Sequence, residues 1–147
     1  PARETEAFLR ERITLKPALE WKSIVSEIKN LPKRARVGYD YAETLARATM
    51  LAVVPVGYWH GYPRALSSIG CVLIGKTECK IIGRVSMDML TVDITDVKRV
   101  RVGDEVVLIA KNQSSPASLS GIATLTDSSW YEVATQLNPL IRRTDAA

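Results

Sequence analysis

The hydrophobic positions of this 147-residue chain mostly follow the patterns of β-strands. Residues 49–56 form a nearly continuous apolar run, and residues 90–94 alternate between apolar and polar side chains. The first pattern is typical of a strand buried on both faces, and the second of a strand buried on one face. Apolar and β-branched residues predict further strands at 17–29, 71–74, 78–82 and 106–109.

Two short helices are predicted near the C-terminal end. Pro116 stands at the start of 117–123 and suits the first turn of a helix. Apolar residues recur at helical intervals within 130–137, where Asp127 or Ser128 can cap the helix. Because strands recur about every ten residues, the chain is predicted to be all-β in class, mostly strands with a few short helices around a barrel-like core.

The length and composition favour one compact domain with its own core. Hydrophobic residues make up 46% of the chain and charged residues 24%, which is an ordinary globular balance. We expect the domain to span 14–147, after a charged N-terminal arm or linker at 1–13. The chain has no apolar run long enough to cross a bilayer and no signal-peptide pattern, so a cytoplasmic protein without membrane contact is expected.

The charged and metal-binding residue types exclude several functions. The net charge is only +4, and the basic clusters at 33–36 and 98–101 lack interleaved aromatic residues that could stack on bases. We interpret them as solvated turns, with no nucleic-acid partner. A single histidine and two cysteines are too few for a metal site. Cys71 and Cys79 either bridge a hairpin or, as the cytoplasm favours, stay reduced.

Three short motifs carry the candidate chemistry. Val37-Gly38-Tyr39 is followed by Gly-Tyr-Trp-His-Gly-Tyr-Pro-Arg at 57–64 and by Gly-Arg-Val-Ser-Met-Asp-Met at 83–89. In this order the motifs resemble the C-terminal β-domain of alanine racemases, isomerases that use pyridoxal phosphate to invert the α-carbon of alanine. The resemblance covers nearly the whole chain.

The resemblance implies a role for each of six residues. Tyr39 matches the catalytic base on one face of the substrate, where a phenol needs nearby positive charge or hydrogen-bond donors to ionise near neutral pH. Met87 matches a residue that contacts the substrate carboxylate, partly through its backbone N–H. Tyr131 matches a tyrosine that hydrogen-bonds the cofactor phosphate. The positions that line the substrate channel are matched by Tyr58, Arg64 and Arg84. For each of the six, packing or structural ion pairing is the alternative.

Four residues depart from the family pattern. Asp40 stands where the family usually has glycine, and its carboxylate would oppose ionisation of the tyrosine if it faced the same way. Trp59 and His60 replace a small residue and an aspartate, which we expect to alter the channel mouth. Trp130 replaces an asparagine before the phosphate-binding tyrosine.

The resemblance also implies what lies outside the chain. In the family, a lysine in a Lys-Ala-Asn-Ala-Tyr-Gly motif of an N-terminal barrel domain holds the pyridoxal phosphate, and these 147 residues contain no such motif. We therefore expect a fragment that is inactive alone, binds no cofactor covalently, and works with the barrel in a homodimeric alanine racemase that makes D-alanine for peptidoglycan. A stand-alone interaction or dimerisation domain without catalysis, or a racemase of serine or another small amino acid, remains an alternative.

Overall fold

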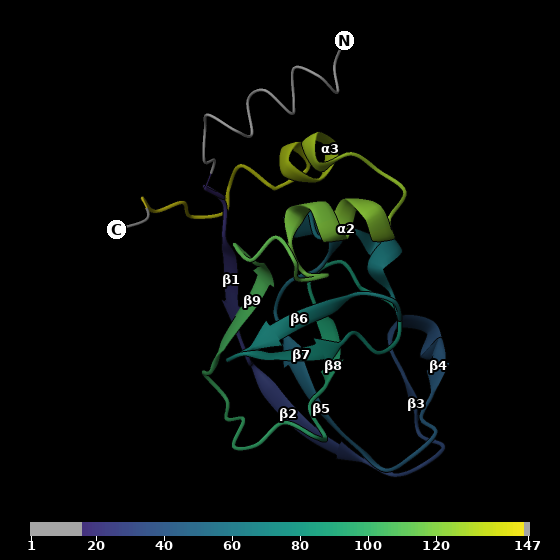
Figure 1. Ribbon diagram of the computed structural model, residues 1–147. Coiled ribbons are helices and arrows are strands. Elements are labelled where there is room, and N and C mark those ends of the chain that lie inside the picture. The colour runs from purple at the N-terminus through teal and green to yellow at the C-terminus, as the bar shows by residue number, and fades with distance from the viewer. Residues whose placement is uncertain (1–15, 146–147) are drawn as a thin grey trace.

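The computed structural model describes residues 16–145 (Figure 1). Within them, a four-stranded sheet has the order β1-β9-β6-β7, a three-stranded sheet the order β2-β5-β8, and a small hairpin pairs β3 with β4. All of these pairings are antiparallel. The strand bounds are β1 Trp21–Ile24, β2 Glu27–Leu31, β3 Arg36–Val37, β4 Glu43–Thr44, β5 Thr49–Val54, β6 Cys71–Ile74, β7 Thr77–Lys80, β8 Leu90–Asp93 and β9 Glu105–Ile109.

The single strand predicted over 17–29 is wrong, because the chain changes sheets in the middle of it. The N–H of Val25 donates to the carbonyl of Asp104 (2.9 Å), next to β9. The N–H of Ser26 donates to the carbonyl of Val53 (2.9 Å), in β5. β1 therefore belongs to the four-stranded sheet and β2 to the three-stranded sheet. An apolar pattern records burial but not which strand is the partner.

The core lies between these two sheets, and the predicted mostly-β class is confirmed. The sheets are joined at one side by the passage from β1 to β2, and at the other by a single bridge between Ile81 and Val92. Both bridge residues are fully buried. The barrel-like core is thus formed by two packed sheets, and within residues 16–145 no continuous ladder closes it.

The first predicted helix begins later than the sequence suggested. Helix α2 spans Leu119–Leu125. Ser118 caps it, since its side-chain oxygen accepts a hydrogen bond from the N–H of Gly121 (3.0 Å). Pro116 therefore precedes the cap instead of occupying the first turn, so the predicted role of this proline is wrong.

The second predicted helix, α3, spans Trp130–Thr135. Its cap is Ser129, whose hydroxyl oxygen accepts from the N–H of Glu132 (3.2 Å), so neither Asp127 nor Ser128 has the predicted capping role. Asp127 has a left-handed backbone (φ 49°), whereas a cap needs the extended backbone that Ser129 has. Both helices lie at the same end of the molecule, beyond the edge of the β6 and β9 sheet (Figure 1).

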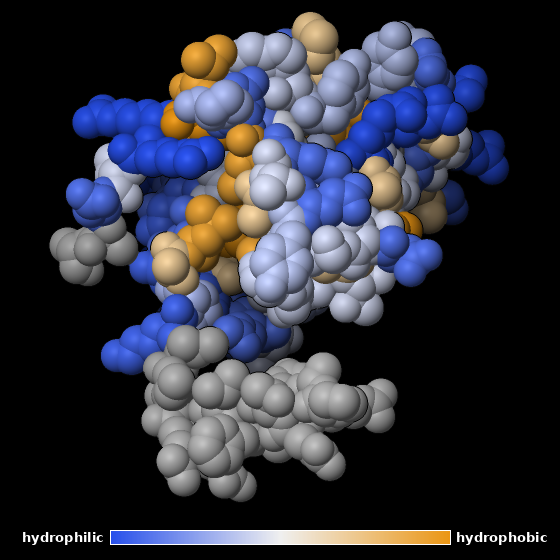
Figure 2. Space-filling view, turned by 90° about the horizontal axis from the view of Figure 1, so that it is seen from above, coloured by the Kyte–Doolittle hydropathy of each residue, from blue (hydrophilic) through white to orange (hydrophobic). Residues whose placement is uncertain are grey.

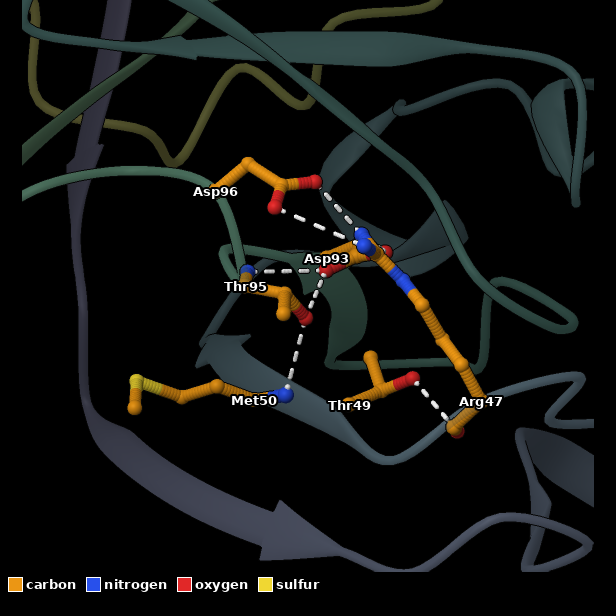
Figure 3. A network of polar contacts seen from close by, with 6 residues as sticks. All are labelled: Arg47, Thr49, Met50, Asp93, Thr95 and Asp96. Atoms are coloured by element: carbon orange, nitrogen blue, oxygen red, sulfur yellow. Dashed lines mark hydrogen bonds and ion pairs between the residues drawn. The ribbon is translucent and has the colours of Figure 1, made fainter.

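A polar network joins the start of β5 to the end of β8 (Figure 3). The Arg47 guanidinium contacts the carboxylates of Asp96 (2.6 Å) and Asp93 (3.4 Å). Thr95 donates to Asp93 through its N–H (2.8 Å) and its hydroxyl (2.5 Å), and accepts from the N–H of Met50 (3.0 Å). Partial burial alone would raise the pKa of Asp93, but the donors from Thr95 and Arg47 outweigh it and hold that pKa below its ordinary value.

The two cysteines are free thiols on the paired strands β6 and β7. Cys71 pairs in register with Lys80, and Cys79 with Val72, so the two cysteines are not opposite one another. Burial raises the pKa of each thiol to about 11. In the described part of the chain, no group of cysteine, histidine and carboxylate side chains is arranged to hold a metal, and no helix is long and apolar enough to span a membrane.

Candidate functional site

The three sequence motifs meet at one cavity of about 880 Å³. Its lining includes Tyr39, Tyr58, Arg64, Arg84 and Met87. These residues come from three 3₁₀ turns and a loop, which together extend from residue 39 to residue 87 of the sequence. Five of the six predicted site residues are thus brought together. The sixth, Tyr131, is not part of the cavity lining.

Two glycines pack the first motif against the third. Gly38 and Gly83 both have left-handed backbones, with φ of 79° and 75°. A Cβ on Gly38 would lie 2.8 Å from the Cα of Gly83, closer than any side chain can approach. Glycine is required at both positions for the conformation and for the contact. This packing places Tyr39, the next residue after Gly38, beside the loop that begins at Gly83.

The second motif is joined to the third by backbone hydrogen bonds. The N–H of Tyr58 donates to the carbonyl of Ser86 (3.0 Å), and the N–H of Trp59 donates to that of Met87 (2.9 Å). A side chain on Gly57 would overlap both of these carbonyl-bearing residues. The glycines of the motifs therefore serve close backbone approach, which is what draws the three segments around one cavity.

Glu43 is a site residue that the sequence reasoning missed. One of its carboxylate oxygens accepts from the N–H of Gly83 (2.6 Å) and from the hydroxyl of Ser68 (2.5 Å). The half-buried carboxylate thus clamps the β3–β4 hairpin, which carries Tyr39, to the third motif. No local pattern marks an acidic residue whose partners lie 25 and 40 positions away.

Tyr39 lies in the 3₁₀ turn η1 (Tyr39–Tyr41), with 60% of its surface exposed. The next residue, Asp40, has a left-handed backbone (φ 59°). Glycine adopts this conformation most easily, and aspartate is one of the few other residues that tolerate it. The Asp40 carboxylate pairs with the Arg84 guanidinium at 3.0 Å. The departure at Asp40 is therefore sterically accommodated, and its charge is partnered within the site.

Met87 lies at the tip of a tight turn closed by Ser86. The Ser86 hydroxyl donates to the carbonyl of Met89 (2.8 Å), and the Ser86 N–H donates to the same oxygen (2.9 Å). The Met87 side chain is 53% exposed, so it does not fill a gap in a buried strand. Within residues 16–145 its N–H donates to no protein group, which leaves it available to an anionic ligand.

A family model for the C-terminal domain of alanine racemase matches residues 18–145. The chain belongs to this family. The alanine racemase of Halothermothrix orenii is 38% identical over 135 residues, which cover 92% of the chain and 36% of that protein. The chain therefore spans about a third of the length of the curated relatives it matches.

Solved alanine racemases have the same fold. The biosynthetic enzyme of Pseudomonas aeruginosa aligns with a TM-score of 0.83 at 30% identity, over 90% of this chain and 36% of that one. The enzyme of Bartonella henselae, solved with covalently bound pyridoxal phosphate, aligns with a TM-score of 0.75 at 31% identity, over 81% and 32% of the two chains. The resemblance to the alanine racemase C-terminal domain, read from three motifs, is thus confirmed.

Trp59 and His60, which depart from the alanine racemase pattern, stabilise a turn and do not form the cavity wall. His60 Nδ1 accepts from the N–H of Gly57 (3.2 Å), and Asn138 Nδ2 donates to the carbonyl of Trp59 (3.0 Å). The indole ring meets the imidazole edge-on, with centroids 5.1 Å apart. Neither Trp59 nor His60 lines the cavity, and their effect on the channel mouth stays a prediction.

Tyr131, the predicted contact to the cofactor phosphate in this alanine racemase domain, lies on α3. Its side chain is 64% exposed and stacks on Trp130, with ring centroids 3.5 Å apart. Viewed from the end that carries the helices, the surface shows apolar groups set among hydrophilic ones (Figure 2). The exposed phenol can donate to a phosphate oxygen, which fits one end of pyridoxal phosphate. The cavity lining contains no lysine, so the amine that would hold the cofactor's aldehyde does not come from it.

Proposed function

We propose that this chain supplies the acid–base group for one face of the substrate in a complete alanine racemase. Tyr39 would give or take a proton at its phenolic oxygen, and the N–H of Met87 would bind the substrate carboxylate. The observation that carries this proposal is their place in one cavity: an exposed phenol and an unpaired amide N–H line the same space as Arg64 and Arg84. Inversion at a carbon needs a proton donor or acceptor on each face, and one cavity here offers one such group.

The cationic side chains of the cavity support an anionic substrate. The Arg64 guanidinium, which forms no ion pair within residues 16–145, favours a carboxylate, whereas Arg84 is paired with Asp40. Pyridoxal phosphate, when bound, supplies the electron sink that makes the α-proton removable. Tyr131 would help to hold its phosphate. The lysine that anchors the cofactor and acts on the other face would come from a barrel domain.

We further propose that Tyr39 serves the active site of a second subunit. Aromatic and methionine side chains remain exposed around the cavity by 46–66% of their surface: Tyr39, Tyr41, Tyr58, Met87 and Met89. Apolar side chains gathered in this way are rarely left uncovered. Tyr131 lies outside this cavity, which is consistent with one chain contributing to two active sites of a homodimer.

The test is Tyr39→Phe in the full-length enzyme, which removes the ionisable oxygen and keeps the ring. Loss of a positioned acid–base group costs about 10²–10⁴ in rate, so racemisation should fall by that factor in both directions. Exchange at the other face should survive: in D₂O, deuterium should still enter D-alanine while conversion to L-alanine is nearly abolished.

Tyr41→Phe is the matched control. Tyr41 lies in the same turn and is equally exposed, but it does not line the cavity, so racemisation should stay within about twofold of the wild type. The proposal fails if Tyr39→Phe racemises alanine normally, or if it stops exchange of both enantiomers equally while the cofactor stays bound.

A further inference from the structure

We propose that Asp40 sets the charge preference of the cavity by holding Arg84 in an ion pair, so that Arg64 is the one arginine left to attract the carboxylate that the Met87 N–H would bind. The site would then select amino acids with one carboxylate over those with two. This inference rests on the proposed function, because it concerns the substrate of the same cavity. It adds a specificity role for a residue that departs from the family pattern.

The ion pair connects the first and third motifs at the wall of the cavity. Arg84 Nη1 lies 3.0 Å from Asp40 Oδ2. Asp40 directly follows Tyr39, and Arg84 directly follows Gly83. The contact between Gly38 and Gly83 fixes the backbones on both sides of the pair. The pair therefore joins two backbone segments that already pack against each other.

The backbone at Asp40 supports a specific role for its side chain. Asp40 and Tyr41 have consecutive left-handed conformations, with φ of 59° and 52°. Such conformations disfavour most side chains, and glycine adopts them at no steric cost. Aspartate is one of the few other residues that tolerate them, and at this position it adds a carboxylate that glycine would not supply. In the described residues, the interaction that Asp40 makes is the pair with Arg84.

The charges at the cavity determine how many carboxylates it can bind. Of its two arginines, Arg84 is engaged by Asp40, whereas Arg64 forms no ion pair within residues 16–145. Asp88 also lines the cavity, and it pairs with neither arginine there. A ligand with a second carboxylate would meet either an arginine that is already neutralised or an acidic side chain, and both disfavour its binding.

The experiment compares succinate with propionate, which differ by one carboxylate. Binding to the full-length, cofactor-loaded protein is measured by broadening of the ligands' ¹³C NMR lines, without turnover. In Asp40→Asn, the affinity ratio of succinate to propionate should rise about fivefold over the wild type. That factor corresponds to about 1 kcal/mol, the upper range for an exposed ion pair.

Control variants distinguish the effect of the Asp40–Arg84 ion pair from the effect of the cavity's overall charge. Asp88→Asn removes one negative charge from the same cavity without freeing an arginine, so the ratio should rise by less than it does in Asp40→Asn. Asp40→Gly, which suits the left-handed backbone, should reproduce the effect of Asp40→Asn. Adding Arg84→Gln to Asp40→Asn should return the ratio to its wild-type value. The inference is overturned if neither Asp40 variant raises the ratio, or if Asp88→Asn raises it equally.

The proposed function is judged by a different measurement on the same protein. If the wild type does not racemise alanine, the proposed function fails, while the binding ratios still decide the role of Asp40. If the enzyme racemises alanine and the ratio is the same in all variants, only the role of Asp40 fails.

Discussion

Replacement of Glu43 should loosen the connection between the Tyr39 hairpin and the third motif. Its carboxylate accepts two short hydrogen bonds, from the Gly83 N–H (2.6 Å) and the Ser68 hydroxyl (2.5 Å). Hydrogen bonds to a charged group contribute about 1.5–3 kcal/mol each, and neutral ones about 0.5–1.5 kcal/mol. Glu43→Gln keeps an acceptor oxygen but loses the charge. Because Glu43 is only half-buried, we expect a loss of about 1–2 kcal/mol in the local free energy of opening.

Glu43→Ala should have a larger effect, because it removes both hydrogen bonds and leaves the Gly83 N–H without a partner. We expect a loss of about 3 kcal/mol. Hydrogen exchange by mass spectrometry on the full-length protein measures this, since each 1.4 kcal/mol of lost opening free energy speeds exchange about tenfold. Peptides that cover 83–89 should exchange about tenfold faster in Glu43→Gln and about a hundredfold faster in Glu43→Ala.

Glu27→Gln is the matched control for this series. Glu27 forms an exposed pair with Lys29 (3.2 Å) on a surface strand, a type of interaction that contributes little. Exchange at 83–89 should not change in this variant. If Glu43→Ala left the exchange of 83–89 at its wild-type rate, the carboxylate would not hold the two motifs together, and the reasoning from its hydrogen bonds would be refuted.

Two further predictions concern stability. Tyr62 is 1% exposed and packs against Trp21, and its hydroxyl has no hydrogen-bond partner within residues 16–145. Tyr62→Phe removes this unpaired hydroxyl and should raise the free energy of unfolding, measured by urea titration, by about 1–3 kcal/mol. A less stable variant would contradict this. The pKa of Asp93 is lower in the folded state than in the unfolded state. The carboxylate therefore contributes to the free energy of unfolding above the unfolded pKa of about 3.9, and this contribution is lost as the pH falls through the folded pKa. Asp93→Asn should therefore cost about 1 kcal/mol at pH 7 and less with increasing acidity, and an equal loss at pH 7 and pH 3 would refute the role of the carboxylate.

The sequence predicted the elements whose signals are local. The strands predicted at 71–74, 78–82 and 90–94 correspond to β6, β7 and β8, because apolar and β-branched side chains mark strands locally. The cap of the second helix was misplaced by one or two residues, because Asp127, Ser128 and Ser129 could serve equally well by type. Only the backbone conformation selects among them.

The three motifs indicated the family and five residues of one cavity, since their order and residue types are properties of the sequence alone. The remaining contacts of the site and the division of the sheets depend on the tertiary structure. Residues 17–29 divide between two sheets, Glu43 reaches Gly83, and Asp40 pairs with Arg84. Each of these depends on which distant segment becomes a neighbour once the sheets pack. A local pattern reports that a residue is buried or charged, and the tertiary structure alone decides which group it meets.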